Sequence, residues 1–374
     1  MHMNVESIFH PVAIGPLTAT NRLIRSATGE AAADLAGLPL AAPMSRIYGD
    51  LARGGVGLII FGHAFVHANG RASARQSGLS ADAHAAAWKP LLAALRPLTR
   101  APLVAQLNYA GRQGYFRGAV PAPNDPAAPL PPPGTALNDF TDKQLENLIP
   151  AFADAAVRAV AAGFDGVQLH LAHGYLLSEC LSAHTNKRSD SWGGPDPANR
   201  RRLPLKIVEA VRRKLPADKA LLVKLNGSDF LPPDGIEPDE AAETAAQLEA
   251  AGVQMIEVSC GMMESGAGLG AARPVHQPEE EAYLLPLATA VAARVHIPVA
   301  TVGGYKTTPV ILRPIGEGLD LVSLSRALVR EPDFPAKIQS GRSHEARCIS
   351  CNKCFGIPEG ALRCMVDHPQ PIEA

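Results

Sequence analysis

The sequence has no long block of one charge and no long apolar run. Its 374 residues carry 35 basic and 36 acidic side chains, a formal net charge of -1. This balance disfavours nucleic acid and acidic membranes as partners.

No stretch approaches the roughly 18 apolar residues of a spanning helix, and the first residues do not resemble a secretion signal. We therefore expect a cytoplasmic protein with a small-molecule substrate and no nucleic-acid or membrane partner. The oligomeric state stays open, a homo-oligomer included.

Cysteine is scarce until the end of the chain. Four of the six cysteines lie close together, at Cys348, Cys351, Cys354 and Cys364, which is not how a secreted disulfide framework is spaced. Four thiolates in a CxxCxxC pattern with a later fourth suit zinc or an iron-sulfur cluster, and reduced thiols are the alternative. We expect a metal here, and we expect Cys180 and Cys260 to be apolar core residues.

Short apolar runs rich in β-branched residues alternate with longer segments of helical periodicity. Eight such runs occur, at residues 22–26, 56–61, 103–107, 166–170, 221–225, 255–259, 298–302 and 320–324. Eight strand-helix units allow a closed barrel or a doubly wound open sheet. The usual open-sheet nucleotide fingerprints, GxGxxG and GxxxxGK[ST], do not occur, so the count favours a (β/α)8 barrel. We expect residues 1–340 to form this barrel with an N-terminal hairpin as its lid, and residues 341–374 to form a short Cys-rich extension.

Two helix starts and one irregular segment have recognisable signals. Thr141 and Gln144 form a capping box at the start of one helix. Asp239 is placed to cap the helix expected around residues 242–250, and Gly252 is placed to end it. Residues 119–138 are dense in proline and follow the third strand. They are interpreted either as a semi-rigid wall or lid on the catalytic face or as a plain surface excursion.

Unusual polar residues stand where five of the predicted strands end, which is where barrel active sites form. Gly303, Gly304 and Ser325-Arg326 follow strands seven and eight, the usual place of a barrel phosphate site. The alternative is an ordinary turn beside a surface arginine, with no phosphate bound. Gln106 ends strand three and suits a ring edge with alternating donors and acceptors.

Lys224 lies within an apolar strand, where a buried cation is costly unless it meets an anion or an electron-rich ligand. It would then stabilise negative charge on a reduced ring. A lysine that reaches solvent, or a Schiff-base lysine in an aldolase or isomerase without flavin, are the alternatives.

His170 and His173 flank the end of strand four, and Tyr175 follows. The two histidines could hold a substrate oxygen while Tyr175 delivers a proton. An HxxH metal site is disfavoured because no carboxylate or third histidine has a convincing spacing.

Several of these segments resemble the old yellow enzyme family of FMN-dependent ene-reductases and NAD(P)H:flavin oxidoreductases. The most specific is HLAHGYLLSECLSAHTNKRSDSWGGPDPANRRR at 170–202. Others are IGPLTATNR in the opening segment, QLNYAGRQ at 106–113, VGG at 302–304 and DLVSLSRALVREPDFP at 320–335. Together they span the predicted barrel.

The resemblance implies FMN as cofactor and NAD(P)H as transient donor, in a ping-pong reaction that ends with hydride transfer to an enone-like C=C bond. It also implies roles for residues of this chain. Ser26, Ala27 and Thr28 would line the flavin, Gln106, His170 and Lys224 would contact its ring, and Gly303, Gly304, Ser325 and Arg326 its phosphate. His170 and His173 would bind the substrate oxygen, and Tyr175 would protonate the alkene. Gly29 replaces a Thr or Cys that is common beside the flavin.

Two rivals stay open. One is a dienoyl-CoA-reductase-like enzyme with a cysteine-bound iron-sulfur cluster, although the chain ends at Ala374 with no further flavin domain to serve. The other is a flavin- or metal-bound redox sensor with little turnover.

Overall fold

The computed structural model describes residues 4–114, 130–266, 273–355 and 360–370. Within these ranges, no helix combines the length and the apolar character needed to cross a bilayer. Most of the proline-rich segment falls outside the described residues. Its described end is anchored, because Leu130 O accepts a hydrogen bond from Asn69 and the Asn138 side chain donates to Thr185 O.

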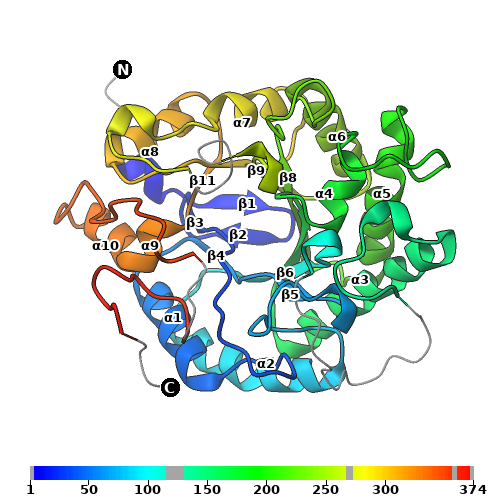
Figure 1. Cartoon of the computed structure of the whole chain (residues 1–374). Helices are drawn as coiled ribbons and strands as arrows, with labels where there is room; N and C mark the ends of the chain where they lie inside the picture. Colours follow the sequence, from blue (N-terminus) through cyan, green and yellow to red (C-terminus); the bar gives the residue numbers. More distant parts are fainter. Residues whose placement is uncertain (1–3, 115–129, 267–272, 356–359, 371–374) are drawn as a thin grey trace.

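Eight parallel strands close into a barrel (Figure 1). Their order is β3-β4-β6-β7-β8-β9-β10-β11, and β11 pairs with β3 to complete the ring. The strands are β3 (Leu23–Arg25), β4 (Leu58–Ile60), β6 (Leu103–Asn108), β7 (Gly166–Leu171), β8 (Ala220–Asn226), β9 (Met255–Ser259), β10 (Val299–Val302) and β11 (Leu321–Leu324). Each of the eight predicted runs overlaps one of these strands, so the barrel is confirmed and the open sheet excluded. A further short strand, β5 (Ala64–Phe65), pairs with the end of β6.

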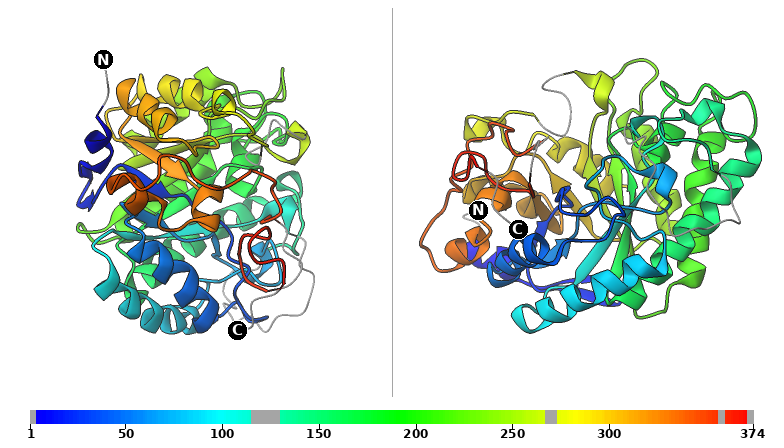
Figure 2. Two further views of the ribbon diagram at one scale, coloured as in Figure 1. Left: turned by 90° about the vertical axis from the view of Figure 1, so that its left-hand side faces the viewer. Right: turned by 60° about the horizontal axis from the view of Figure 1, so that its bottom comes forward.

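Helices surround the barrel in every view (Figures 1 and 2). They are α1 (Ala41–Arg53), α2 (Asp82–Leu95), α3 (Asp142–Ala162), α4 (Leu176–Leu181), α5 (Pro197–Lys214), α6 (Pro238–Ala250), α7 (Leu285–Ala292), α8 (Thr308–Gly316), α9 (Arg326–Arg330) and α10 (Phe334–Gln339). The capping box at the start of α3 is confirmed, since Thr141 and Gln144 bond each other's backbone N–H. Asp239 is not a cap. Glu237 holds that position in α6, because Pro238 fits the first helical residue and moves the start two residues earlier than expected.

An N-terminal hairpin, β1 (Val12–Ile14) and β2 (Leu17–Ala19), closes one end of the barrel. Its Val12, Ile14 and Ala19 pack in one cluster with the first residues of β4, β8, β9 and β11. The hairpin therefore seals the N-terminal ends of the strands. The predicted hairpin lid therefore covers the end of the barrel opposite the large cavity.

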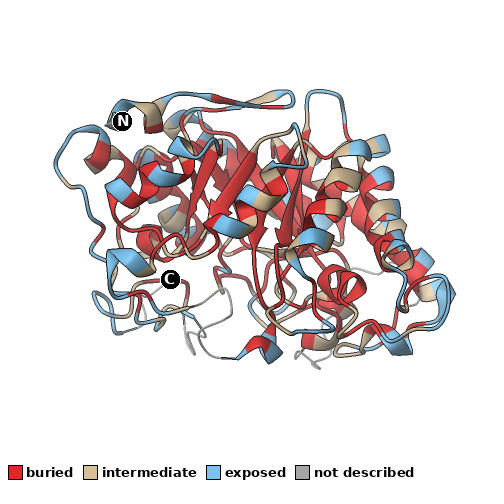
Figure 3. Ribbon diagram, turned by 90° about the horizontal axis from the view of Figure 1, so that it is seen from above, coloured by how far each residue is buried: buried red, intermediate tan, exposed pale blue. Residues whose placement is uncertain are grey.

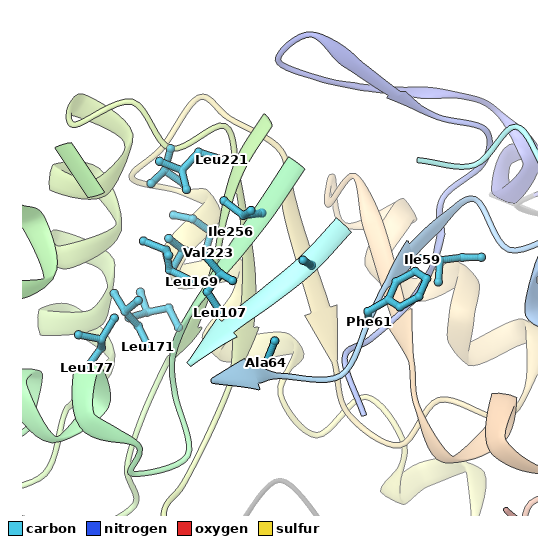
Figure 4. Close-up of a cluster of buried hydrophobic side chains, with 14 of the residues drawn as sticks. Ile59, Phe61, Ala64, Leu107, Leu169, Leu171, Leu177, Leu221, Val223 and Ile256 are labelled. Atoms are coloured by element: carbon cyan, nitrogen blue, oxygen red, sulfur yellow. The ribbon is translucent and has the colours of Figure 1, made fainter. Parts of the chain in front are cut away.

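Alternate residues of each strand face the surrounding helices and the barrel interior. Leu107, Leu169, Leu221, Val223 and Ile256 belong to the outer core, in which helices such as α4 also take part (Figure 4). Between them, Ala220, Leu222 and Met255 point inward to the hairpin. Both faces are buried along most of each strand (Figure 3), which explains the continuous apolar runs.

The Cys-rich extension packs on the side of the barrel near α9 and α10, where it is drawn in red (Figures 1 and 2). Ala346 N donates to Lys306 O, and Leu362 N donates to Glu30 O. Asp367 forms an ion pair with Arg330 at 2.8 Å. These contacts connect the extension to the loops after β10 and β3 and to α9.

Candidate active site

The C-terminal ends of the strands open into a cavity of about 1080 Å³, counting space open to solvent. Most of the predicted ring-binding and catalytic residues line this one cavity: Ser26, Ala27, Thr28, Gln106, His170, His173, Tyr175, Lys224 and Ser325. They come from five different strand ends, so the barrel brings together groups that are up to 299 positions apart in the sequence. The ends of these five strands therefore converge on one cavity.

A chain of buried polar groups runs beneath this cavity. Gln106 Nε2 donates to Gln168 Oε1 at 2.7 Å, and Gln168 Nε2 donates to Glu257 Oε2 at 3.0 Å. Lys224 Nζ lies 3.2 Å from Glu257 Oε1 and donates to Ser26 Oγ at 2.7 Å. The strand register explains the pairing, because Gln106 lies opposite Gln168 and Lys224 opposite Glu257.

Glu257 is the anion that compensates Lys224. Burial alone would raise the pKa of Glu257, but Lys224 and hydrogen bonds from Ser26, Gln168 and Ser323 together lower it below its usual value. The sequence argument that Lys224 needs a ligand was therefore incomplete, because an internal carboxylate already meets it. Lys224 has three N–H donors and two described partners, so one donor stays available to the cavity it lines.

His170 and His173 meet at right angles, with ring centroids 5.0 Å apart. The ring of Tyr175 lies 5.0 Å from that of His170. His173 adopts a left-handed backbone (φ 64) held by Asn226 Oδ1, and its Nε2 lies 2.7 Å from Ser259 Oγ. Such a conformation is strained for histidine and marks a position fixed by its surroundings.

Burial keeps these histidines neutral. It lowers the pKa of His173 to about 3 and that of His170 well below its usual value, and the neighbouring Lys224 adds to both shifts. The pair can therefore donate hydrogen bonds to a substrate oxygen at neutral pH without carrying charge.

The predicted phosphate site is a second cavity of about 400 Å³ that shares Val302, Ser325 and Phe355 with the first. Gly304 and Arg326 line it as expected, and Arg326 donates to Arg273 O and Asn352 Oδ1. Gly303 does not line this cavity, and a Cβ atom added to it would meet the backbone of residues 282–284. The two cavities therefore adjoin, and the smaller of them, called the narrow end, is lined by the cations Lys306 and Arg326.

The four tail cysteines line a third, mostly apolar cavity of about 320 Å³. Cys354 also lines the large cavity, and Cys348 also lines the phosphate cavity. Within the described residues, no three His, Cys, Asp or Glu side chains are placed to hold a single metal ion. Cys180 and Cys260 are fully buried, as expected, and burial raises the pKa of Cys260 to about 12.

Three residues of this site were missed from the sequence: Glu257, His63 and Lys306. Glu257 could have been found by period-two alternation, since Met255 and Ser259 share its face. Lys306 follows the VGG segment by two residues and lines the phosphate cavity. His63 gave no signal, because its approach to His170, at 6.1 Å between ring centroids, depends on the barrel closing.

Comparison with known proteins identifies the family. The model of the NADH:flavin oxidoreductase / NADH oxidase family matches residues 7–345. The chain belongs to this family. FMN is therefore its cofactor, and the resemblance to old yellow enzymes drawn from the sequence is confirmed.

Individual relatives cover different lengths. An NADH oxidase of Thermoanaerobacter brockii is 34% identical over 377 residues, which cover 96% of this chain and 56% of that protein. A complex of 2-naphthoyl-CoA reductase with 2-naphthoyl-CoA matches with a TM-score of 0.84 at 25% identity, covering 97% of this chain and 57% of that one. An old yellow enzyme homologue from Zymomonas mobilis shares the fold, with a TM-score of 0.72 at 23% identity over 91% of this chain and 94% of that one. The chain thus spans a little over half the length of the first two proteins.

Proposed function

We propose that the protein passes hydride from NADH or NADPH, through FMN, to an electron-poor C=C bond in a ping-pong cycle. The observation that carries this proposal is the shared space of the two cavities. The histidine pair, the Gln106 and Lys224 side chains, and the cations Lys306 and Arg326 all line these two adjoining cavities. Those three features match the substrate oxygen, the ring and the phosphate that this reaction requires.

Different residues of the chain would bind the phosphate and the ring of the cofactor. Arg326 and Lys306 would hold its phosphate, since both are buried cations at the narrow end. Gln106 and Lys224 would meet the ring edge, where Lys224 stabilises the negative charge that develops on reduction. When bound, FMN supplies the hydride-accepting and hydride-donating chemistry.

The substrate end depends on three side chains. His170 and His173 would donate hydrogen bonds to the carbonyl oxygen of the substrate and so make its β-carbon electron-poor. Hydride then arrives at that carbon, and Tyr175 gives its phenolic proton to the α-carbon. The product is the saturated carbonyl compound, and the donor leaves as NAD(P)⁺ before the second substrate binds.

The test is an anaerobic visible spectrum of the purified protein. We expect flavin absorbance that NADPH bleaches and that a cyclic enone restores. A colourless protein would contradict the proposal and favour a barrel aldolase or isomerase. Flavin that NADPH reduces but no enone reoxidises would favour a redox sensor.

Replacing the histidine pair checks the division of roles. The double variant His170→Ala/His173→Ala should bind a phenol roughly 10- to 100-fold more weakly, from the loss of two hydrogen bonds, and should retain its flavin. Titration of the bound flavin with the phenol measures this. Loss of flavin from the variant would show that the pair holds the cofactor instead.

A second candidate, a dienoyl-CoA-reductase-like enzyme fed through an iron-sulfur cluster, is favoured by one observation. All four tail thiols surround a cavity that adjoins the flavin space through Cys354. Thiols spread around a volume suit a cluster better than one zinc ion. Iron and sulfide in the purified protein, lost in Cys348→Ser, would support this candidate, and zinc or no metal would contradict it.

A further inference from the structure

His63 is a third imidazole in the large cavity, and the proposed reaction has not used it. It follows β4 and lies partly exposed to the cavity. Its ring lies 5.1 Å from that of Tyr175 and 6.1 Å from that of His170, between centroids. It is therefore close to the groups that would meet the ring and the substrate.

The hydrogen bonds behind His63 fix which nitrogen carries its proton. Gln76 Nε2 lies 3.1 Å from His63 Nδ1 and donates to His63 O at 3.0 Å. The orientation of this amide is set by the backbone, because Gln76 Oε1 accepts from Ala72 N at 2.7 Å. An amide N–H₂ can only donate, so His63 Nδ1 must accept and Nε2 must carry the hydrogen. Asn108 Nδ2, 2.9 Å from Nδ1, fits the same arrangement.

Burial lowers the pKa of His63 to about 4. The imidazole is therefore neutral at physiological pH, and its single N–H is the one on Nε2. Neutral histidines with a fixed tautomer act as hydrogen-bond donors of defined direction.

Nε2 of His63 faces the part of the cavity that Gly29 leaves open. A Cβ atom added to Gly29 would lie 3.8 Å from Nε2, and the other neighbour within 4 Å would be Cδ2 of the same ring. Gly29 and His63 both line the large cavity, together with Gln106. The missing side chain at residue 29 thus gives the His63 N–H access to a ligand in this space.

We propose that His63 donates its Nε2 hydrogen to the flavin ring beside Gly29 and thereby stabilises the reduced, electron-rich form. The inference rests on the proposed function, since it needs a flavin in this cavity. A donor aimed at developing negative charge favours the reduced state over the oxidised one. His63 therefore tunes how readily the ring accepts hydride. Gln76 and Asn108 contact Nδ1 of His63 and keep its hydrogen on Nε2.

The midpoint potential of the bound flavin tests this without turnover. In the holoenzyme with His63→Leu, the ratio of reduced to oxidised flavin at a fixed poise should fall about tenfold, which is ~30 mV for a two-electron couple. His63→Gln, whose amide can still donate, should recover most of that ratio. His67→Leu is the matched control, because His67 lies in the same loop but outside the cavity lining, and it should leave the potential unchanged.

Each outcome decides the inference. A lower potential in His63→Leu with recovery in His63→Gln supports it. An unchanged potential in His63→Leu, or an equal loss in both variants, overturns it while the proposed function stands. A wild-type protein that binds no flavin would remove the proposed function as well.

Discussion

The two ends of the barrel interior are built from the same strands but from opposite kinds of side chain. At the N-terminal end, Leu58, Leu222 and Met255 pack against the hairpin in an apolar cluster. At the C-terminal end, Gln106, Lys224 and Glu257 form a connected polar network. The inward-facing positions of one strand change from apolar to polar within a few residues, as in β8, where Leu222 precedes Lys224.

The difference separates stability from chemistry. The apolar end is stabilised by the burial of apolar surface, which does not depend on a bound ligand. The polar end contains a desolvated ion pair that contributes little net stability but positions donors toward the cavity. Substitutions at the two ends should therefore differ in their effects on the free energy of unfolding, on FMN binding and on the pH dependence of stability.

The largest effect is expected where the ion pair is broken. Glu257→Gln leaves Lys224 buried without its anion, and the free energy of unfolding of the apoprotein should fall by about 3–5 kcal/mol. Urea denaturation measures this. In the double variant Glu257→Gln/Lys224→Met the loss should be smaller, because no uncompensated charge is left. Equal losses in the single and the double variant would mean that the pair is not the cause.

A change at the apolar end sharpens the contrast. Leu222→Ala should lower the free energy of unfolding by about 2–5 kcal/mol, from lost burial and the cavity left behind. The FMN dissociation constant should stay unchanged, because Leu222 belongs to the hairpin cluster. Urea denaturation of the apoprotein and an FMN titration of the same variant check both statements. Weakened FMN binding would show that the two ends are coupled.

The last effect is a pH dependence at the polar end, which per pH unit is the smallest of these changes in stability. Burial lowers the pKa of His63 to about 4 and that of His173 to about 3. At these two histidines the unfolded chain binds more protons below about pH 6.5, so their contribution to stability should fall as the pH decreases from there toward 4. Glu179, whose pKa burial raises to about 8, acts in the opposite direction over the same range. Each histidine contributes up to about 1.4 kcal/mol per pH unit. Denaturation curves at several pH values should show a shallower slope for His63→Leu, and an unchanged slope for Leu222→Ala. Equal slopes for His63→Leu and the wild type would contradict a neutral, buried His63.

Much of the fold could be predicted because it depends on local patterns. Continuous apolar runs such as residues 221–225 identify strands covered on both faces, and their number indicates a barrel. The position of a residue at a strand end then places Gln106, His170 and Lys224 in one site. The N-cap of α6 was predicted wrongly at Asp239, because Pro238 takes the first helical position and leaves Asp239 inside the helix.

The rest of the site depends on contacts across the barrel that no local pattern carries. Glu257 is matched to Lys224 by the register of neighbouring strands, and a one-residue shift would separate them. The tautomer of His63 is set by Gln76, which lies 13 positions later in a loop without regular structure. The approach of Cys354 to the flavin cavity likewise follows from how the extension packs.

The most direct test of the central claim compares FMN binding in two arginine variants. Arg326→Ala removes a buried cation from the narrow end of the cavity, and Arg294→Ala removes an exposed one that pairs with Glu243. FMN titration of the apoproteins should show a dissociation constant at least roughly 30-fold higher for Arg326→Ala and unchanged for Arg294→Ala. Wild-type affinity in Arg326→Ala would contradict a flavin phosphate at this end of the barrel.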